Sequence, residues 1–211
     1  MLNSCLINPM PYNSLTLNGR GSLSVSPDLV VIRLGVETRG ESLTQVQNEN
    51  SIISNKILEG LNQIEIEDIE TYQYFVDRVF DYQDGRQTDR GYIVRNIFQI
   101  ISGNIQDAGL IIDTAVAHGA NVVEFVSFQV SDVDTYYKKA LSLAVKDAVD
   151  KAQYLEEHNN IVSPSILKIT ELSSPPISFS DAFTLREGPM TTPIQPSTQE
   201  IQANVKIEFT F

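Results

Sequence analysis

Acidic and basic side chains alternate along a stretch between residues 68 and 102 that is otherwise rich in Tyr, Phe and Val. Two neighbouring carboxylates could act as a general acid and base, or bind a cation through their oxygens. The arginines between them favour another interpretation, in which the charges pair on a solvated turn or form a contact surface between subunits. The spacing of a calcium-binding loop is missing. These charged residues are Asp77, Arg78, Asp81, Asp84, Arg86, Asp89 and Arg90.

The remaining candidates for chemistry do not form a recognisable site. His118 lies at the end of one predicted helix and His158 just beyond another. The two lack the spacing of a zinc-binding pair, and Cys5 is remote from both in the sequence. A phosphate-binding glycine loop lies between a strand and a helix. Gly19 and Gly21 lie within a predicted strand, so they indicate a bulge or a close backbone contact. We therefore predict no catalytic residue, no metal and no cofactor.

Composition excludes several classes of partner. Fifteen Lys and Arg against 27 Asp and Glu give a net charge of -12, which repels nucleic acid and anionic lipid surfaces. No run reaches the roughly 18 apolar residues of a membrane-spanning helix, so we predict no membrane insertion. A single cysteine and the lack of a recognisable secretory signal predict a cytoplasmic protein. A mature exported form, from which a signal has been removed, is the alternative.

The periodicity of apolar residues predicts an α+β protein. An apolar-polar alternation indicates strands, and a spacing of three and four indicates helices. The order of elements from the second strand onward is βαββαβ, which is typical of ferredoxin-like folds with two helices on one face of an antiparallel sheet. A long helix and the terminal strands then extend or cover this sheet. The expected elements are strands 15–25 and 30–36, helix 42–63, a hairpin over 68–102, helix 105–118, strand 122–130, helix 134–157, and strands 166–172 and 201–211.

The chain is expected to form a flexible N-terminal arm, 1–13, and a single domain, 14–211. Within the domain, residues 173–197 form a long Pro-rich loop without a clear period. A loop of this length is either functional or mobile. Its apolar side chains predict docking on the domain or on a neighbouring molecule, with a partly disordered insertion as the alternative. These side chains are Phe179, Phe183, Leu185 and Met190.

The long helix repeats alanine on one face, at Ala140, Ala144, Ala148 and Ala152. Alanine favours helix formation, and its short side chain lets another backbone approach closely. The stripe is expected to pack on a sheet of the same chain. Packing on a copy of itself in another subunit is the alternative.

Around these features the sequence resembles the SIMPL-domain family, whose bacterial members include periplasmic immunogens. The similarity covers residues 15 to 211. It includes the two spaced glycines of the first strand, the Pro27-Asp28 turn, the Gly35-Val36 strand end and the alanine-rich helix. Val149 and Glu156 depart from the family pattern, and the helix end lacks the usual glycine-rich turn.

The resemblance implies an α+β fold and assembly into homo-oligomers, because one family member builds large rings. Some members are linked with stress tolerance, and the family name comes from an animal protein that associates with a signalling kinase. The resemblance implies no enzymatic activity and transfers no catalytic residue.

Three functional hypotheses follow. The first is a non-enzymatic homo-oligomeric scaffold or stress-related assembly protein. The second is a module that recruits a protein partner through the 173–197 loop or the 68–103 hairpin. The third, a hydrolase that uses the hairpin carboxylates, ranks last. The candidate interaction surface consists of Asp77, Arg78, Asp81, Asp84, Arg86, Phe179, Phe183 and Met190.

Overall fold

The computed structural model describes residues 13–83, 85–159, 164–172 and 196–211. The expected arm, apart from its last residue, and most of the expected 173–197 loop lie outside these residues. The chain divides into two compact units, each assembled from separate parts of the sequence. The described residues of unit 1 come from 1–25, 132–177 and 200–211, and those of unit 2 come from 26–131 and 178–199. The predicted domain boundaries stay a prediction.

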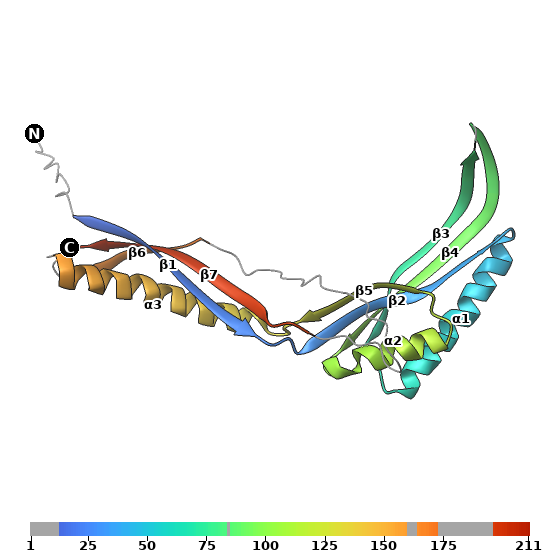
Figure 1. The fold of residues 1–211 in the computed structure, drawn as a ribbon, viewed down its shortest axis with the longest axis horizontal. Helices are drawn as coiled ribbons and strands as arrows, with labels where there is room; N and C mark the ends of the chain where they lie inside the picture. Colours follow the sequence, from blue (N-terminus) through green and yellow to red (C-terminus); the bar gives the residue numbers. More distant parts are fainter. Residues whose placement is uncertain (1–12, 84, 160–163, 173–195) are drawn as a thin grey trace, which may run out of the picture. The chain divides into compact units, whose positions relative to one another are not determined.

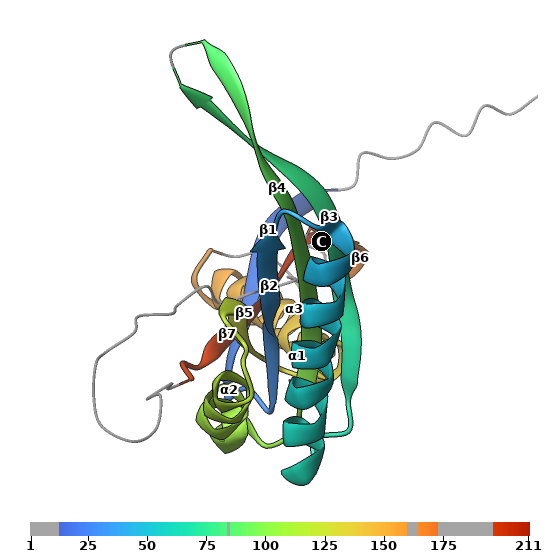
Figure 2. The same cartoon turned by 90° about the vertical axis from the view of Figure 1, so that its right-hand side faces the viewer.

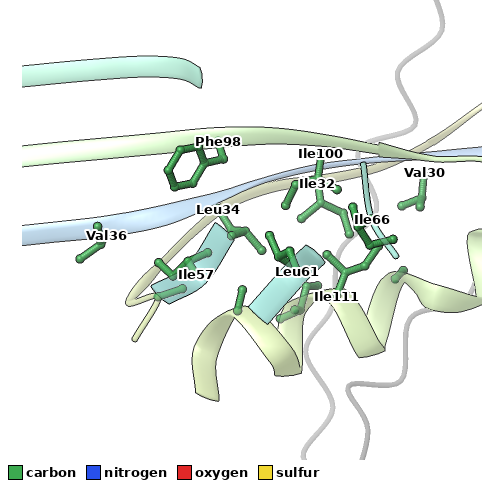
Figure 3. Packing of buried hydrophobic residues seen from close by; sticks show 14 of the residues in the cluster. Val30, Ile32, Leu34, Val36, Ile57, Leu61, Ile66, Phe98, Ile100 and Ile111 are labelled. Carbon is green, nitrogen blue, oxygen red and sulfur yellow. The ribbon is translucent and has the colours of Figure 1, made fainter. Parts of the chain in front are cut away.

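Unit 2 contains the predicted βαββαβ order of elements (Figure 1). Its four-stranded sheet has the order β3-β4-β2-β5, and every neighbouring pair of strands is antiparallel. Helices α1 and α2 both pack on one face of this sheet, as the interior residues in Figure 3 show. The elements are β2 (Leu29–Gly40), α1 (Leu43–Gln63), β3 (Ile69–Gln83), β4 (Arg86–Ser102), the short 3-10 helix η1 (Ile105–Asp107), α2 (Ala108–Ala117) and β5 (Val122–Gln129).

The core of unit 2 contains every second residue of β2, as the alternation of apolar residues in this strand predicts. Alternate residues of this strand are fully buried, because they face α1 and α2 and meet Ile57, Leu61 and Ile111 (Figure 3). Burying each such aliphatic side chain contributes about 1.5–3 kcal/mol. The alternate residues of β2 with no exposed surface are Val30, Ile32, Leu34 and Val36.

Asn50 interrupts the apolar stripe of α1 and is nevertheless only 1% exposed. Its side-chain amide donates to the backbone carbonyls of Val36 at 3.2 Å and of Val94 at 3.0 Å. The Ser54 hydroxyl donates in turn to Asn50 Oδ1. The buried amide therefore joins α1 to β2 and β4 without an unmade hydrogen bond of its own, which is the condition for burying a polar group.

The helix ends in unit 2 follow the sequence signals in part. The expected helix 42–63 begins one residue later, at Leu43, and the side chain of Ser42 before it makes no capping hydrogen bond. Gly119 follows α2 with a φ of 105°, a value that glycine adopts without a steric penalty.

Unit 1 is a three-stranded sheet with the order β1-β7-β6, accompanied by the long helix α3 (Figures 1 and 2). The α+β class is confirmed. The terminal strands do not join the βαββαβ sheet, however, because they pair with one another in a sheet of their own. Alternation shows which face of a strand is buried, and it leaves the pairing partner open. The elements are β1 (Ser14–Val25), α3 (Val133–Asn159), β6 (Ser165–Glu171) and β7 (Gln199–Thr210).

The interior of unit 1 is formed by one face of β7 and the alanine stripe of α3. Alternate residues of β7 are at most 3% exposed, and the four alanines of α3 are at most 1% exposed. Beyond the end of β7, the Phe211 N–H donates to the carbonyl of Asn13, just before β1, at 3.1 Å. The buried apolar residues of β7 are Ile201, Ala203, Val205, Ile207 and Phe209.

Candidate interaction surfaces

The charged residues of the β3–β4 hairpin pair with one another across the two strands. Arg78 forms an ion pair with Asp89, and Arg90 forms one with Asp81 at 3.0 Å. Asp77 accepts a hydrogen bond from the backbone N–H of Arg78 at 2.7 Å. The expected pairing of carboxylates with the interleaved arginines is therefore present, and all four ion-pair partners keep much of their side chain in solvent.

The other predicted surface residues are placed less fully. Asp84, Phe179, Phe183 and Met190 lie outside the described residues. Arg86 begins β4, and the structure describes only its backbone. Of the predicted surface, the structure therefore describes the side chains of Asp77, Arg78 and Asp81. The role of the surface in binding stays a prediction.

β3 has a single neighbour in the sheet, β4, so its outer edge is free of strand pairing within the described chain. Both faces of this strand expose large apolar side chains, for example Tyr74 at 55% and Tyr82 at 70%. The sequence indicated a strand here but gave no signal of exposure, because aromatic residues on both faces are more typical of a buried strand. The exposed side chains are Tyr72, Tyr74, Phe75, Val76, Phe80 and Tyr82.

A polar hollow lies at the base of the hairpin. Glu41, Arg78, Asp89, Arg90 and Tyr92 line it, together with Gly91. The Gly91 N–H donates to Asp89 Oδ1 at 2.9 Å, and this bond, followed by the Arg78 ion pair, lowers the pKa of the Asp89 carboxyl. Asp89 therefore stays ionised and keeps Arg78 in place.

A second group of charges lies on the sheet face of unit 2 that is opposite to the helices. The guanidinium of Arg33 stacks 3.8 Å from the ring centroid of Tyr72 and donates to Gln99 at 2.9 Å. Arg95 contacts Glu37 at 2.7 Å. Burial raises the pKa of Glu37, but hydrogen bonds from Arg95 and Arg39 lower it further than burial raises it. These contacts link β2, β3 and β4, and no short sequence pattern predicts them.

α3 packs on β1 at backbone distance. A Cβ atom added to Gly19 would lie 2.0 Å from the carbonyl oxygen of Ala144, and one added to Gly21 would lie 2.0 Å from that of Ala140. Two residues along a strand advance about 6.6 Å, close to the 5.4 Å of one helical turn, so each glycine meets one alanine. The predicted close backbone contact and the packing of the stripe within the chain are both confirmed.

Polar side chains of α3 also occupy the outer edge of β1. The Arg20 N–H donates to Asp147 Oδ2 at 2.9 Å, and Lys151 Nζ donates to the carbonyl of Asn18 at 3.0 Å. Asp147 and Lys151 pair with each other at 2.6 Å, one helical turn apart. Backbone groups at a sheet edge are otherwise open to a further strand. The hydrogen bond from Lys151, followed by that from Arg20, lowers the pKa of Asp147.

Asp147→Asn is expected to cost about 0.5–1 kcal/mol at pH 7, since it removes a partly exposed ion pair. Because the pKa of Asp147 is lower in the folded than in the unfolded chain, its contribution is present above the unfolded value of about 3.9 and is lost as the pH falls through the folded value. Urea unfolding at pH 7, 5 and 2.5 measures this. Asp150→Asn, on the same helix, is the control, and a difference from the native protein that stays constant down to pH 2.5 would contradict the assignment.

The described part of the chain contains neither a cluster of metal-binding side chains nor a helix suited to a bilayer. No group of three or more His, Cys, Asp or Glu residues there could hold a metal ion. None of the helices in the same residues combines the length and apolarity that crossing a bilayer requires.

The comparison with protein families covers both units. The model of the SIMPL family, described as a protein of unknown function (DUF541), matches residues 15–209. The chain belongs to the SIMPL family. It is 23% identical over 170 residues to the 26 kDa periplasmic immunogenic protein of Brucella melitensis, covering 77% of this chain and 68% of that protein. It is 25% identical over 143 residues to the uncharacterized protein YggE of Escherichia coli, covering 67% of this chain and 58% of the relative.

The prediction of a cytoplasmic protein is wrong, because the name of the Brucella SIMPL relative places that relative in the periplasm and points to export. The prediction rested on one cysteine and on the lack of a recognisable signal. A folded domain with few cysteines is compatible with either compartment, and a targeting segment, not the domain, determines export.

Proposed function

We propose that this SIMPL protein is an exported, non-enzymatic scaffold or stress-related assembly protein that forms homo-oligomers, with subunit contacts through the β3–β4 hairpin. The observation that carries the proposal is the free edge of β3 with its six exposed large apolar side chains. An exposed apolar edge strand of this length favours pairing with another chain. The names of the family and of the two relatives state no reaction, which is consistent with a protein that is not an enzyme.

The charge pattern of the hairpin supports contact between like chains. Two arginines and two aspartates there form ion pairs across the strands, so the charge density of the hairpin is low although each chain carries a net charge of -12. Exposed Phe75 and Val76 would supply the apolar contact.

Phe75→Lys is expected to reduce the mass of the oligomer at 10 μM by at least half, because a lysine at this edge introduces a charge where two apolar edges meet. Size-exclusion chromatography with light scattering measures the mass against the 23.5 kDa of the single chain. Leu110→Lys is the control, since Leu110 is similarly exposed but lies on α2. A native protein that runs as a clean monomer at this concentration would refute the proposal.

The second candidate is a module that binds a different protein through the hairpin or the 173–197 loop. The polar hollow at the hairpin favours it, because Glu41, Tyr92 and the paired charges of Arg78 and Asp89 line it and present hydrogen-bonding groups to a polar side chain of a partner. Deleting residues 176–195 tests whether the loop is needed for binding a partner, for oligomerisation, or for both. Loss of a defined partner with an unchanged oligomer mass would favour this candidate over the scaffold.

A further inference from the structure

The two edges of the unit 1 sheet differ. At β1, α3 occupies the outer backbone groups through Asp147 and Lys151. At the other edge, β6 is paired with β7 on one side and with no further described strand. β6 is thus the edge of this sheet where the described chain leaves backbone groups open to another strand.

Apolar side chains of β6 are exposed along the same edge. Ile166 and Ile169 are 46% and 49% exposed, although their partners across the ladder, Phe209 and Ile207, are almost fully buried. Residues that face each other in a ladder share one face of the sheet, so the two isoleucines lie on the face where β7 is covered. The side chains that bury this face of β7 do not extend over β6. The exception is Tyr137 of α3, whose hydroxyl donates to Glu171.

We infer that β6 pairs with β6 of a second copy of this chain, antiparallel and around a two-fold axis near Ile169. The two three-stranded sheets would then join into one continuous sheet, and Ile166 and Ile169 of both copies would cover one another. A two-fold contact uses the same patch on both subunits, which these identical apolar strips provide. The inference rests on the proposed homo-oligomer and names a second contact in it, separate from the hairpin.

The charges of β6 suit contact with a copy of itself. The strand carries one lysine, Lys168, and one glutamate, Glu171, so its net charge is zero within a chain of net charge -12. This edge therefore adds no local excess of like charge to the contact between two copies, although each chain carries a net charge of -12. A strongly basic partner would find no excess of negative charge here.

The first test is the double variant Ile166→Lys and Ile169→Lys, measured by light scattering at 10 μM. The mass is expected to fall by at least half, while Ile52→Lys, which changes a similarly exposed isoleucine of α1, leaves it unchanged. An unchanged mass in the double variant, together with a reduced mass in Phe75→Lys, overturns the β6 contact and leaves the proposed scaffold standing. A monomeric native protein overturns both.

A cross-linking experiment tests the same contact without depending on the folding of a charged variant. In a Cys5→Ser background, Ile169→Cys is expected to form a disulfide between two chains on mild oxidation, since the axis places the two positions face to face. Ile52→Cys is the control and should remain reduced. Absence of the Ile169→Cys cross-link in a protein that is still oligomeric would overturn the inference.

Discussion

Gly19→Ala is expected to destabilise unit 1 by about 3–5 kcal/mol and to lower its melting temperature by on the order of 10 °C. The added Cβ would lie 2.0 Å from the carbonyl oxygen of Ala144 and 3.0 Å from the Cβ of Ala148. Both are parts of a rigid helix, so neither can turn away as the end of a flexible side chain would. The helix must move off β1, and the hydrogen bond from Arg20 to Asp147 is lost with it.

Gly103→Ala is the matched control for this experiment. A Cβ at Gly103 would meet no atom within 4 Å, so this variant should unfold like the native protein. Urea unfolding followed by circular dichroism compares the two. If Gly19→Ala and Gly103→Ala had equal midpoints, the close packing of α3 on β1 described here would be refuted.

Ala144→Phe is expected to cost at least about 3 kcal/mol and to reduce the yield of soluble protein. Ala144 is completely buried, and its backbone oxygen is one of the two points, with that of Ala140, at which the helix comes closest to the glycines of β1. A phenyl ring cannot fit in that space without displacing the helix from the sheet, and overpacking of this kind is costly because protein interiors are already close-packed.

Ser142→Phe, two residues earlier and on the exposed face of the same helix, is the control for Ala144→Phe. It introduces the same ring without the clash, and it changes helix propensity little because Ser and Phe have similar propensities, whereas Ala→Phe loses roughly half a kcal/mol. The difference between the two melting temperatures therefore measures the overpacking together with this small loss of propensity. Equal melting temperatures would mean that the alanine stripe does not face a close neighbour.

Features that depend on local periodicity could be predicted from the sequence. The alanines of α3 predicted both the helix and the close approach of another backbone, and the two glycines of β1 predicted a bulge or a close backbone contact. The structure then shows that these two features meet each other. The alternation of β2 identified its buried face, and the order βαββαβ identified the elements of unit 2. In each case the feature is set by the spacing of residues that are near one another in the sequence, so it can be recognised without knowing which distant segments are in contact.

Features that depend on contacts between distant residues could not be predicted in this way. The separate sheet of unit 1 requires knowing that β7 pairs with β1 and β6, which lie far away in the sequence. The exposure of Tyr74 and Phe75 on β3 depends on what lies beside that strand, and their residue types favour burial. The network of Arg33 with Tyr72 and Gln99 joins three strands, so no local pattern contains it.

Because α3 occupies the outer edge of β1, it limits how many chains can add strands to the unit 1 sheet. A second copy joined at β6 would carry its own helix-covered β1 to the far side of the shared sheet. Both edges of the shared sheet would then be closed, so addition of strands to this sheet would stop at two copies, and any further chain would have to join through the hairpin of unit 2. Asp147 and Lys151 would thus limit polymerisation, and variants that remove both side chains offer a direct way to ask whether open-ended fibres then form.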